Sequence, residues 1–183
     1  MFLSSMETIK GYSIGLDVSM TASGCYYASM HPDLDDYYCE LINRDTKTRD
    51  TYRVFEMATA IIEDLEAIQS FAPVAIVVME DYGPINKFAG KITQRAEICG
   101  IVKHHIISRM RVPFATISPT SLKKYTTGSG RSEKDSMVSH AESMYGLVTK
   151  SNNIADASHL AHFGYGLLSG RNPHCEYQRF SPD

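Results

Sequence analysis

Residues 12–18 read YSIGLDV and residues 23–30 read SGCYYASM, two apolar runs rich in strand-forming residues on either side of a short turn. Such a pair predicts two antiparallel strands. The first run contains one acidic residue, Asp17, and a carboxylate inside a sheet is costly to bury unless it is paired or binds a cation. Asp17 is therefore the first candidate site residue, and the alternative is an outward-facing aspartate on a half-exposed strand.

Helices and strands alternate along the rest of the chain. The run AIVVM at residues 75–79 is typical of a central strand covered on both faces. Residues 118–131 are predicted to form a loop, with Ser132 and either Asn152 or Asn153 capping the last two helices. The predicted strands are 12–18, 23–30, 36–43, 75–79 and 113–117, and the predicted helices are 54–68, 86–111, 132–145 and about 152–168.

This order predicts an α/β protein with an RNase H-like fold, a five-stranded mixed sheet with helices on both faces. A single domain is expected to fill residues 1–183, with a core at about 11–168 and a C-terminal tail at 169–183. The actin-like ATPase cores share the element order. They require two duplicated domains and a second glycine-rich phosphate loop, however, for which 183 residues leave no room.

The composition is typical of a globular protein from a reducing compartment. Hydrophobic residues make up 43% of the chain and charged residues 21%, which suffices for a packed core. No apolar run reaches the roughly 18–20 residues of a membrane span. The four cysteines are widely separated without a CxxC pair, which favours buried thiols over a disulfide framework or a zinc site. The N-terminus lacks the apolar run of a signal peptide, and we expect a cytoplasmic location with no membrane contact.

Charge is segregated along the chain, whose net charge is −3. Residues 31–66 hold ten acidic and four basic residues. Residues 82–134 hold ten basic residues against only two acidic ones, a net charge of +8. A basic segment in an acidic chain indicates a face that binds a polyanion such as nucleic acid, and the alternative is a set of solvated helix faces.

Two further acidic residues lie where a strand ends and where a helix begins. Glu80 follows AIVVM directly, and ligand sites in open α/β sheets gather at such strand ends. The alternative is a loop glutamate, with Asp81 as a fallback candidate. Asp156 lies near the start of the last helix, where the alternative is stabilisation of the helix N-terminus. With Asp17 they supply the oxygen ligands that Mg²⁺ prefers, and two such ions about 3.5–4 Å apart support phosphodiester hydrolysis.

Four motifs resemble those of the RuvC-type Holliday junction resolvases, in the same order and over roughly residues 12–168. IGLDVSMTASG at residues 14–24 is similar to their first strand and turn, and VVMED at 77–81 to their second acidic motif. GSGRSEKD at 128–135 resembles the glycine-rich segment before a helix that carries a functional lysine. NIADASHLA at 153–161 resembles the closing motif, in which Asp-Ala begins the last helix.

The resemblance implies roles for single residues. Asp17 would bridge two Mg²⁺ ions, for which Mn²⁺ can substitute, and Glu80 and Asp156 would be the flanking ligands. Lys134 would contact the scissile phosphate or stabilise its charge in the transition state. The family has an acid or histidine at the position of Asn153, which can coordinate through its carbonyl oxygen but brings no charge. His159, one turn beyond Asp156, is a possible substitute.

The resemblance also implies a homodimer that cuts two strands of a four-way DNA junction, in recombination and repair, without a small-molecule cofactor. Small residues on the 86–111 helix, namely Ala89, Thr93, Ala96 and Gly100, would allow close approach of a partner helix, although they could equally pack on the chain's own sheet. The candidate DNA-binding residues are Tyr82 and Phe88 for base stacking and Lys87, Lys123, Lys124 and Arg131 for phosphates. Alternatives are an RNase H-like nuclease acting on other branched DNA or RNA, and a non-catalytic junction-binding protein.

Overall fold

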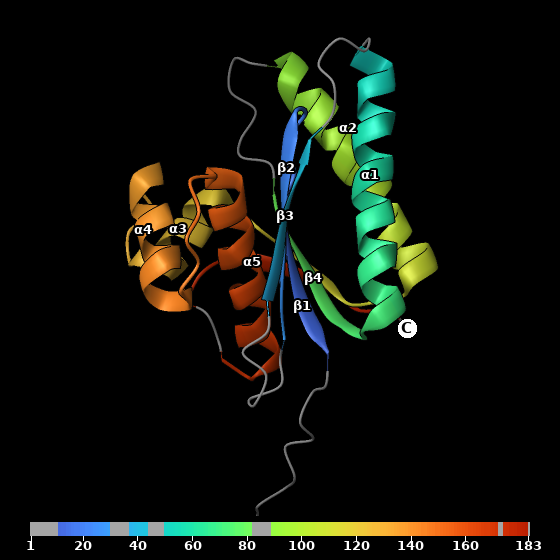
Figure 1. Cartoon of the computed structure of the whole chain (residues 1–183). Coiled ribbons are helices and arrows are strands. Elements are labelled where there is room, and N and C mark those ends of the chain that lie inside the picture. The colour runs from blue at the N-terminus through green and yellow to red at the C-terminus, as the bar shows by residue number, and fades with distance from the viewer. Residues whose placement is uncertain (1–10, 30–36, 44–49, 82–88, 172–173, 183) are drawn as a thin grey trace, which may run out of the picture.

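The computed structural model describes residues 11–29, 37–43, 50–81, 89–171 and 174–182, which form one mixed sheet between two layers of helices (Figure 1). The strands are β1 (Tyr12–Asp17), β2 (Ala22–Ser29), β3 (Tyr37–Asn43), β4 (Val74–Glu80), β5 (Phe114–Ile117) and β6 (Tyr177–Phe180). The helices are α1 (Asp50–Phe71), α2 (Ala89–His105), the π-helical turn η1 (Ile106–Met110), α3 (Pro119–Thr127), α4 (Lys134–Tyr145) and α5 (Asn152–Leu168).

The strand order in the sheet is β3-β2-β1-β4-β5-β6. β1 pairs antiparallel with β2 and parallel with β4, β4 pairs parallel with β5, and the two edge strands are antiparallel to their neighbours. The mixed sheet and its first five strands are thus confirmed. The strand count is wrong by one, because β6 lies in the tail that the sequence predicts to be irregular. All four β6 residues are exposed, so no buried alternation marks this strand in the sequence.

The two layers of helices are explained by the alternating side chains of the central strands. α1 and α2 cover one face of the sheet, and α3, α4 and α5 lie on the other (Figure 1). Along β4, Val77 and Met79 enter the core shared with α1 and α2, whereas Ile76 and Val78 enter the core shared with α5. All four side chains are fully buried, which confirms that AIVVM is a central strand covered on both faces.

Helix α5 packs unusually close to β1 and β2 because both strands present a glycine to it. A Cβ atom at Gly15 would lie 1.9 Å from the Ala157 carbonyl oxygen, and one at Gly24 would lie 2.1 Å from the Asn153 carbonyl oxygen. Real side chains never approach backbone this closely, so the two glycines allow the helix to lie against the strand backbones. This contact brings the start of α5 beside the end of β1.

Several predicted boundaries are wrong for identifiable reasons. The predicted loop at 118–131 contains α3, in which Pro119 is the first helical residue and the Ser118 hydroxyl accepts a hydrogen bond from the Ser121 backbone N–H at 3.2 Å. Ser118-Pro119 is therefore a helix-start signal that the sequence analysis missed. Ser132 does not cap α4, because its hydroxyl bonds to the Ser129 carbonyl at 2.9 Å. Ser151, one residue before the predicted caps, caps α5.

The described residues contain no helix that is both long enough and apolar enough to cross a membrane. All four cysteines lie in the described part of the chain and are free thiols. Cys25 and Cys99 are buried as predicted, whereas Cys39 and Cys175 are only half-buried. Burial raises the pKa of Cys25 well above its usual value, so this thiol is part of the core.

Candidate active site

The parallel pairing of β1 and β4 brings two of the predicted acidic residues to the same edge of the sheet. Leu16 is in register with Met79, so Asp17 and Glu80 follow at the adjacent carboxyl ends of the two strands. The third acid, Asp156, comes from the first turns of α5, which packs across β1. Asp17 is only 8% exposed. The alternative of an outward-facing aspartate is therefore wrong.

The negative charges of the acidic residues act on the pKa values of Asp17 and Asp156. The pKa of Asp17 is raised to about 8, first by burial and then by the charges of Glu80 and Asp156. The pKa of Asp156 is raised to about 6 by burial and by the charge of Glu80. Three acids far apart in the sequence therefore form one electrostatic cluster. Clusters of acidic residues with shifted pKa values are typical of cation-binding and acid–base sites.

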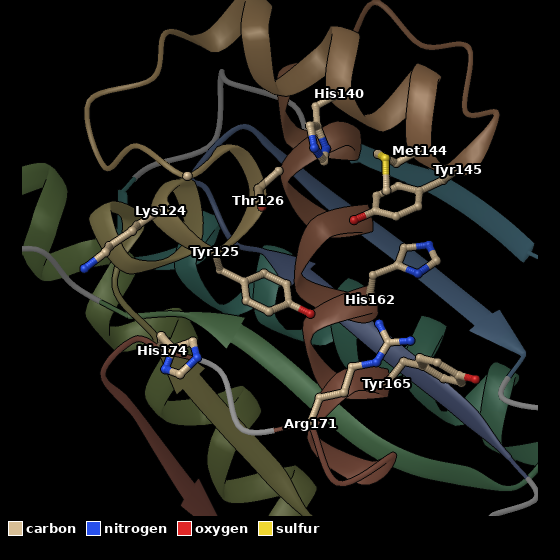
Figure 2. Close-up of a pocket in the computed structure, with 11 residues that line it drawn as sticks. Lys124, Tyr125, Thr126, His140, Met144, Tyr145, His162, Tyr165, Arg171 and His174 are labelled. Carbon is tan, nitrogen blue, oxygen red and sulfur yellow. The ribbon is translucent and has the colours of Figure 1, made fainter.

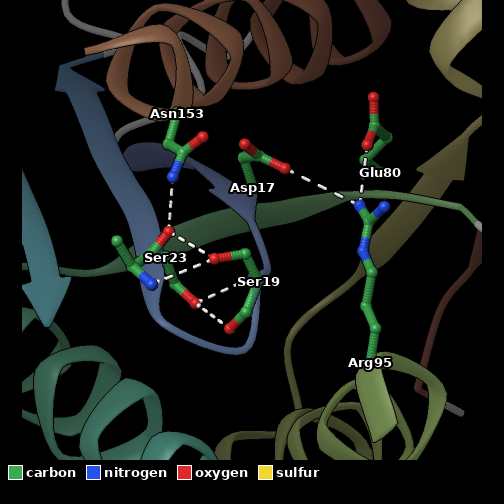
Figure 3. A network of polar contacts seen from close by, with 7 residues as sticks. Asp17, Ser19, Ser23, Glu80, Arg95 and Asn153 are labelled. Carbon is green, nitrogen blue, oxygen red and sulfur yellow. Dashed lines mark hydrogen bonds and ion pairs between the residues drawn. The ribbon is translucent and has the colours of Figure 1, made fainter. Parts of the chain in front are cut away.

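A basic residue that the sequence analysis counted only as part of the basic segment lies directly against this cluster. The Arg95 guanidinium, from α2, places Nη2 2.7 Å from Glu80 Oε2 and 3.6 Å from Asp17 Oδ1 (Figure 3). Arg95 is one of several basic residues on an amphipathic stretch, and helical spacing alone does not say which of them points at the sheet edge. No signal in the sequence identifies it.

Asn153 connects α5 to the turn between β1 and β2. Its side-chain amide nitrogen donates a hydrogen bond to the Ala22 carbonyl, and Figure 3 shows its side-chain oxygen on the side of Asp17. Ser19 and Ser23 stabilise the same turn. The Ser19 hydroxyl donates a hydrogen bond to the Ala22 carbonyl at 2.6 Å, and the Ser23 hydroxyl donates one to the Ser19 carbonyl at 3.1 Å. The predicted metal ligand thus also has a structural role.

The predicted cations and aromatic residues do not all lie at the acids. Lys134 lowers the pKa values of Asp17 and Asp156, and Lys123 lowers that of Asp156, so both amines lie beside the acids. Arg131 is exposed in the turn before α4. Tyr82, Lys87 and Phe88 lie outside the described residues.

His159 does not replace Asn153 as a ligand. Its Nε2 lies 2.9 Å from the Met137 carbonyl oxygen and its Nδ1 lies 3.3 Å from the Tyr145 hydroxyl. The side chain is fully buried, and burial lowers its pKa to about 4. Although His159 is one turn from Asp156, it faces α4 and holds that helix to α5, so the expectation that it substitutes as a ligand is wrong.

Solved structures share this arrangement of sheet and helices. RuvC from Thermus thermophilus superposes with a TM-score of 0.67 at 16% identity, covering 91% of this chain and 99% of that one. T. thermophilus RuvC in complex with a Holliday junction substrate gives a TM-score of 0.70 at 16% identity, covering 92% and 99%. The chain has the RuvC fold. The yeast mitochondrial Holliday junction resolvase gives 0.59 at 11% identity, covering 85% of this chain and 78% of that one.

The likeness to RuvC lies in the fold, since identity to these structures is low. No model of a known family and no curated protein sequence matches the chain. The predicted RNase H-like class is confirmed.

A cavity of about 720 Å³ lies on the α3, α4 and α5 side of the RuvC fold, apart from the acids (Figure 2). It is lined by basic and aromatic side chains, among them Lys124, Tyr125, His140, Tyr145, His162 and Arg171. Tyr145 and His162 stack with ring centroids 3.6 Å apart. Of the predicted site residues that the structure describes, only Lys124 lines this cavity. Neighbouring lysines on α3 thus have different surroundings, since Lys123 acts on the pKa of Asp156 and Lys124 lies at the cavity.

The donor chemistry of the site fits a hard divalent cation. Asp17, Glu80 and Asp156 offer carboxylate oxygens at one sheet edge, and the Asn153 side-chain oxygen lies on the same side. Their mutual repulsion is the kind that a bound cation relieves. Within the described ranges, no three Asp, Glu, His or Cys side chains are already close enough together to hold an ion. Arg95, in contact with two of the carboxylates, lies in this site instead.

The raised pKa of Asp17 predicts a pH dependence of stability in the absence of metal. Because the folded-state pKa of Asp17 lies above its ordinary value of 3.8, the folded protein favours the protonated carboxyl. This contribution to stability is present at low pH and is lost as the pH rises towards about 8. We expect the Tm in EDTA to fall between about pH 5 and pH 8, and to fall less in Asp17→Asn, as thermal unfolding followed by circular dichroism would measure. A wild-type Tm that rises between about pH 5 and pH 8 would contradict the raised pKa of Asp17.

Proposed function

We propose that the protein is a divalent-metal-dependent endodeoxyribonuclease that resolves four-way DNA junctions. The observation that carries the proposal is the electrostatic cluster of Asp17, Glu80 and Asp156 at one edge of the sheet. Lys123 and Lys134 beside it supply positive charge for a phosphate backbone. The solved structures with this fold include RuvC bound to a Holliday junction substrate, which makes branched DNA the favoured substrate.

The residues divide the work of phosphodiester hydrolysis between them. Asp17, Glu80 and Asp156, with the carbonyl oxygen of Asn153, would hold Mg²⁺ or Mn²⁺, which supplies an activated water and stabilises the leaving oxygen. Lys134, exposed at the first position of α4, would approach the scissile phosphate and stabilise the charge that develops on it. Burial of Asp17 in the β1 end holds its carboxylate in a fixed position. The products would be 5′-phosphate and 3′-hydroxyl ends.

We propose that the active form is a homodimer that pairs through α2. Thr93 and Gly100 are exposed and Ala96 is half-buried, whereas Ile98 and Cys99 on the same helix face the core. The exposure of Thr93 and Gly100 supports contact with a partner helix over packing on the chain's own sheet. A dimer would place two active sites on one junction and allow symmetric cleavage of two strands.

A cleavage panel tests the proposed substrate. We expect the purified protein to cut a labelled four-way junction in Mg²⁺ or Mn²⁺ much faster than a three-way junction, a flap or a linear duplex. Sedimentation velocity of the same preparation should show a dimer. Equal cleavage of flaps or structured RNA would favour a broader RNase H-like nuclease. Junction binding with no cleavage in either metal would favour a non-catalytic junction-binding protein and contradict the proposed enzyme.

A further inference from the structure

Arg95 is in the place where the proposed function puts a metal ion. Its Nη2 lies 2.7 Å from Glu80 Oε2 and 3.6 Å from Asp17 Oδ1, between the ends of β1 and β4 (Figure 3). The side chains of Asp17 and Glu80 are 11% and 13% exposed, and that of Arg95 is 26% exposed. The ion pairs are thus largely withdrawn from water, where a charge without a partner is strongly unfavourable.

We propose that Arg95 is a built-in counter-ion of the metal-free enzyme, which divalent cations displace from Glu80 and Asp17 when they bind. This inference rests on the proposed metal site and deepens it. Arg95 and the metal would then be alternative occupants of the same carboxylates. The guanidinium keeps the acidic cluster stable before metal arrives, and its displacement lowers the net affinity for metal.

Among the described residues, the ion pairs of Arg95 are those with the two acids. Both of its ion pairs use the single atom Nη2. Its Nε is buried, yet it has no hydrogen-bond partner among the described residues. A guanidinium with a permanent structural role commonly uses several of its five N–H groups in a fixed fork. Arg95 is therefore held mainly by the charges that a metal ion would neutralise.

The distances also explain why the two cations compete. Mg²⁺ binds a carboxylate oxygen at about 2.0–2.1 Å and requires near-octahedral surroundings. The Glu80 Oε2 atom already accepts the Arg95 N–H at 2.7 Å, so a metal ion on that oxygen would meet the guanidinium charge at short range. With Arg95 in place, the described residues offer no set of three metal-binding side chains at ligating spacing.

The test measures metal binding and stability without DNA. Isothermal titration of Mg²⁺ and of Mn²⁺ would be compared for the wild-type protein, Arg95→Gln and the control Arg109→Gln, an exposed arginine on η1. We expect Arg95→Gln to bind either ion roughly tenfold more tightly and to have a lower Tm in EDTA, because its acids have lost their counter-ion. The control should match the wild type in both measurements.

Arg95→Lys keeps the positive charge but not the planar guanidinium. This variant takes the place of Arg95→Gln in the metal-binding test if Arg95→Gln does not fold. It should bind metal with an affinity between those of the wild type and Arg95→Gln. Unchanged or weaker metal binding by Arg95→Gln, or by Arg95→Lys if only that variant folds, would overturn the counter-ion role while leaving the proposed nuclease intact. If neither the wild type nor the variant binds Mg²⁺ or Mn²⁺, the metal site of the proposed function fails as well.

Discussion

We expect Asp17→Asn to abolish junction cleavage, with a rate at least about 10³-fold below that of the wild type, and to retain junction binding. The amide keeps the size of the side chain but removes the charge that would bind the metal. The pKa of Asp17 responds to the charges of Glu80, Asp156, Arg95 and Lys134. Single-turnover cleavage in Mg²⁺ and gel-shift binding in Ca²⁺ or EDTA would measure the two effects separately.

A matched control comes from a second partly buried aspartate outside the site. Burial raises the pKa of Asp64 on α1 as it does that of Asp17, but the neighbours of Asp64 are Cys25 and Glu40. The cleavage rate of Asp64→Asn should therefore lie within a few-fold of the wild-type rate.

Asp17→Asn should also be at least as stable as the wild type above about pH 7, because a carboxylate with a raised pKa is lost. Near-normal cleavage by Asp17→Asn would show that catalysis does not use this cluster.

We expect Gly15→Ala to destabilise the protein by more than about 3 kcal/mol, which is at the severe end for one added methyl group. The new Cβ would lie 1.9 Å from the Ala157 carbonyl oxygen, 2.5 Å from the Ala161 backbone nitrogen and 2.9 Å from the Leu160 Cβ. These are mostly backbone atoms of α5, so no side-chain rotation relieves the overlap. The helix must move away from β1, and Asp156 moves with it. Urea unfolding would give the loss of stability.

Gly100→Ala, compared with the wild type at a protein concentration low enough to keep both monomeric, is the control for the glycine prediction. Gly100 is exposed on α2 and has no atom within 4 Å of the position of an added Cβ. Alanine is favoured over glycine inside a helix by about 0.5–1 kcal/mol, so this variant should be as stable as the wild type or slightly more stable. If Gly15→Ala unfolds at the same urea concentration as Gly100→Ala, the close packing of α5 on β1 is not what holds the site together.

The acids of the site were predictable because each has a local signature. Asp17 interrupts an apolar strand, Glu80 ends a central strand, and Asp156 lies near the start of the last helix. The neighbouring cations were only partly predictable. Lys123 and Lys134 do lie beside the acids, but Lys124 faces the cavity, and Arg95 was counted without being recognised.

The layers of the fold and the three carboxylates can be predicted from local patterns, because strand and helix periodicity is set by side chains within a few residues of one another. The tertiary structure alone decided that Arg95 meets Glu80, that His159 bonds to Met137 and that the exposed residues 177–180 form a sixth strand. Such contacts depend on how the helices cross the sheet and on which edge strand of the sheet is available for pairing. Those are properties of packing between distant segments, and a linear pattern of hydrophobic and charged residues does not specify them.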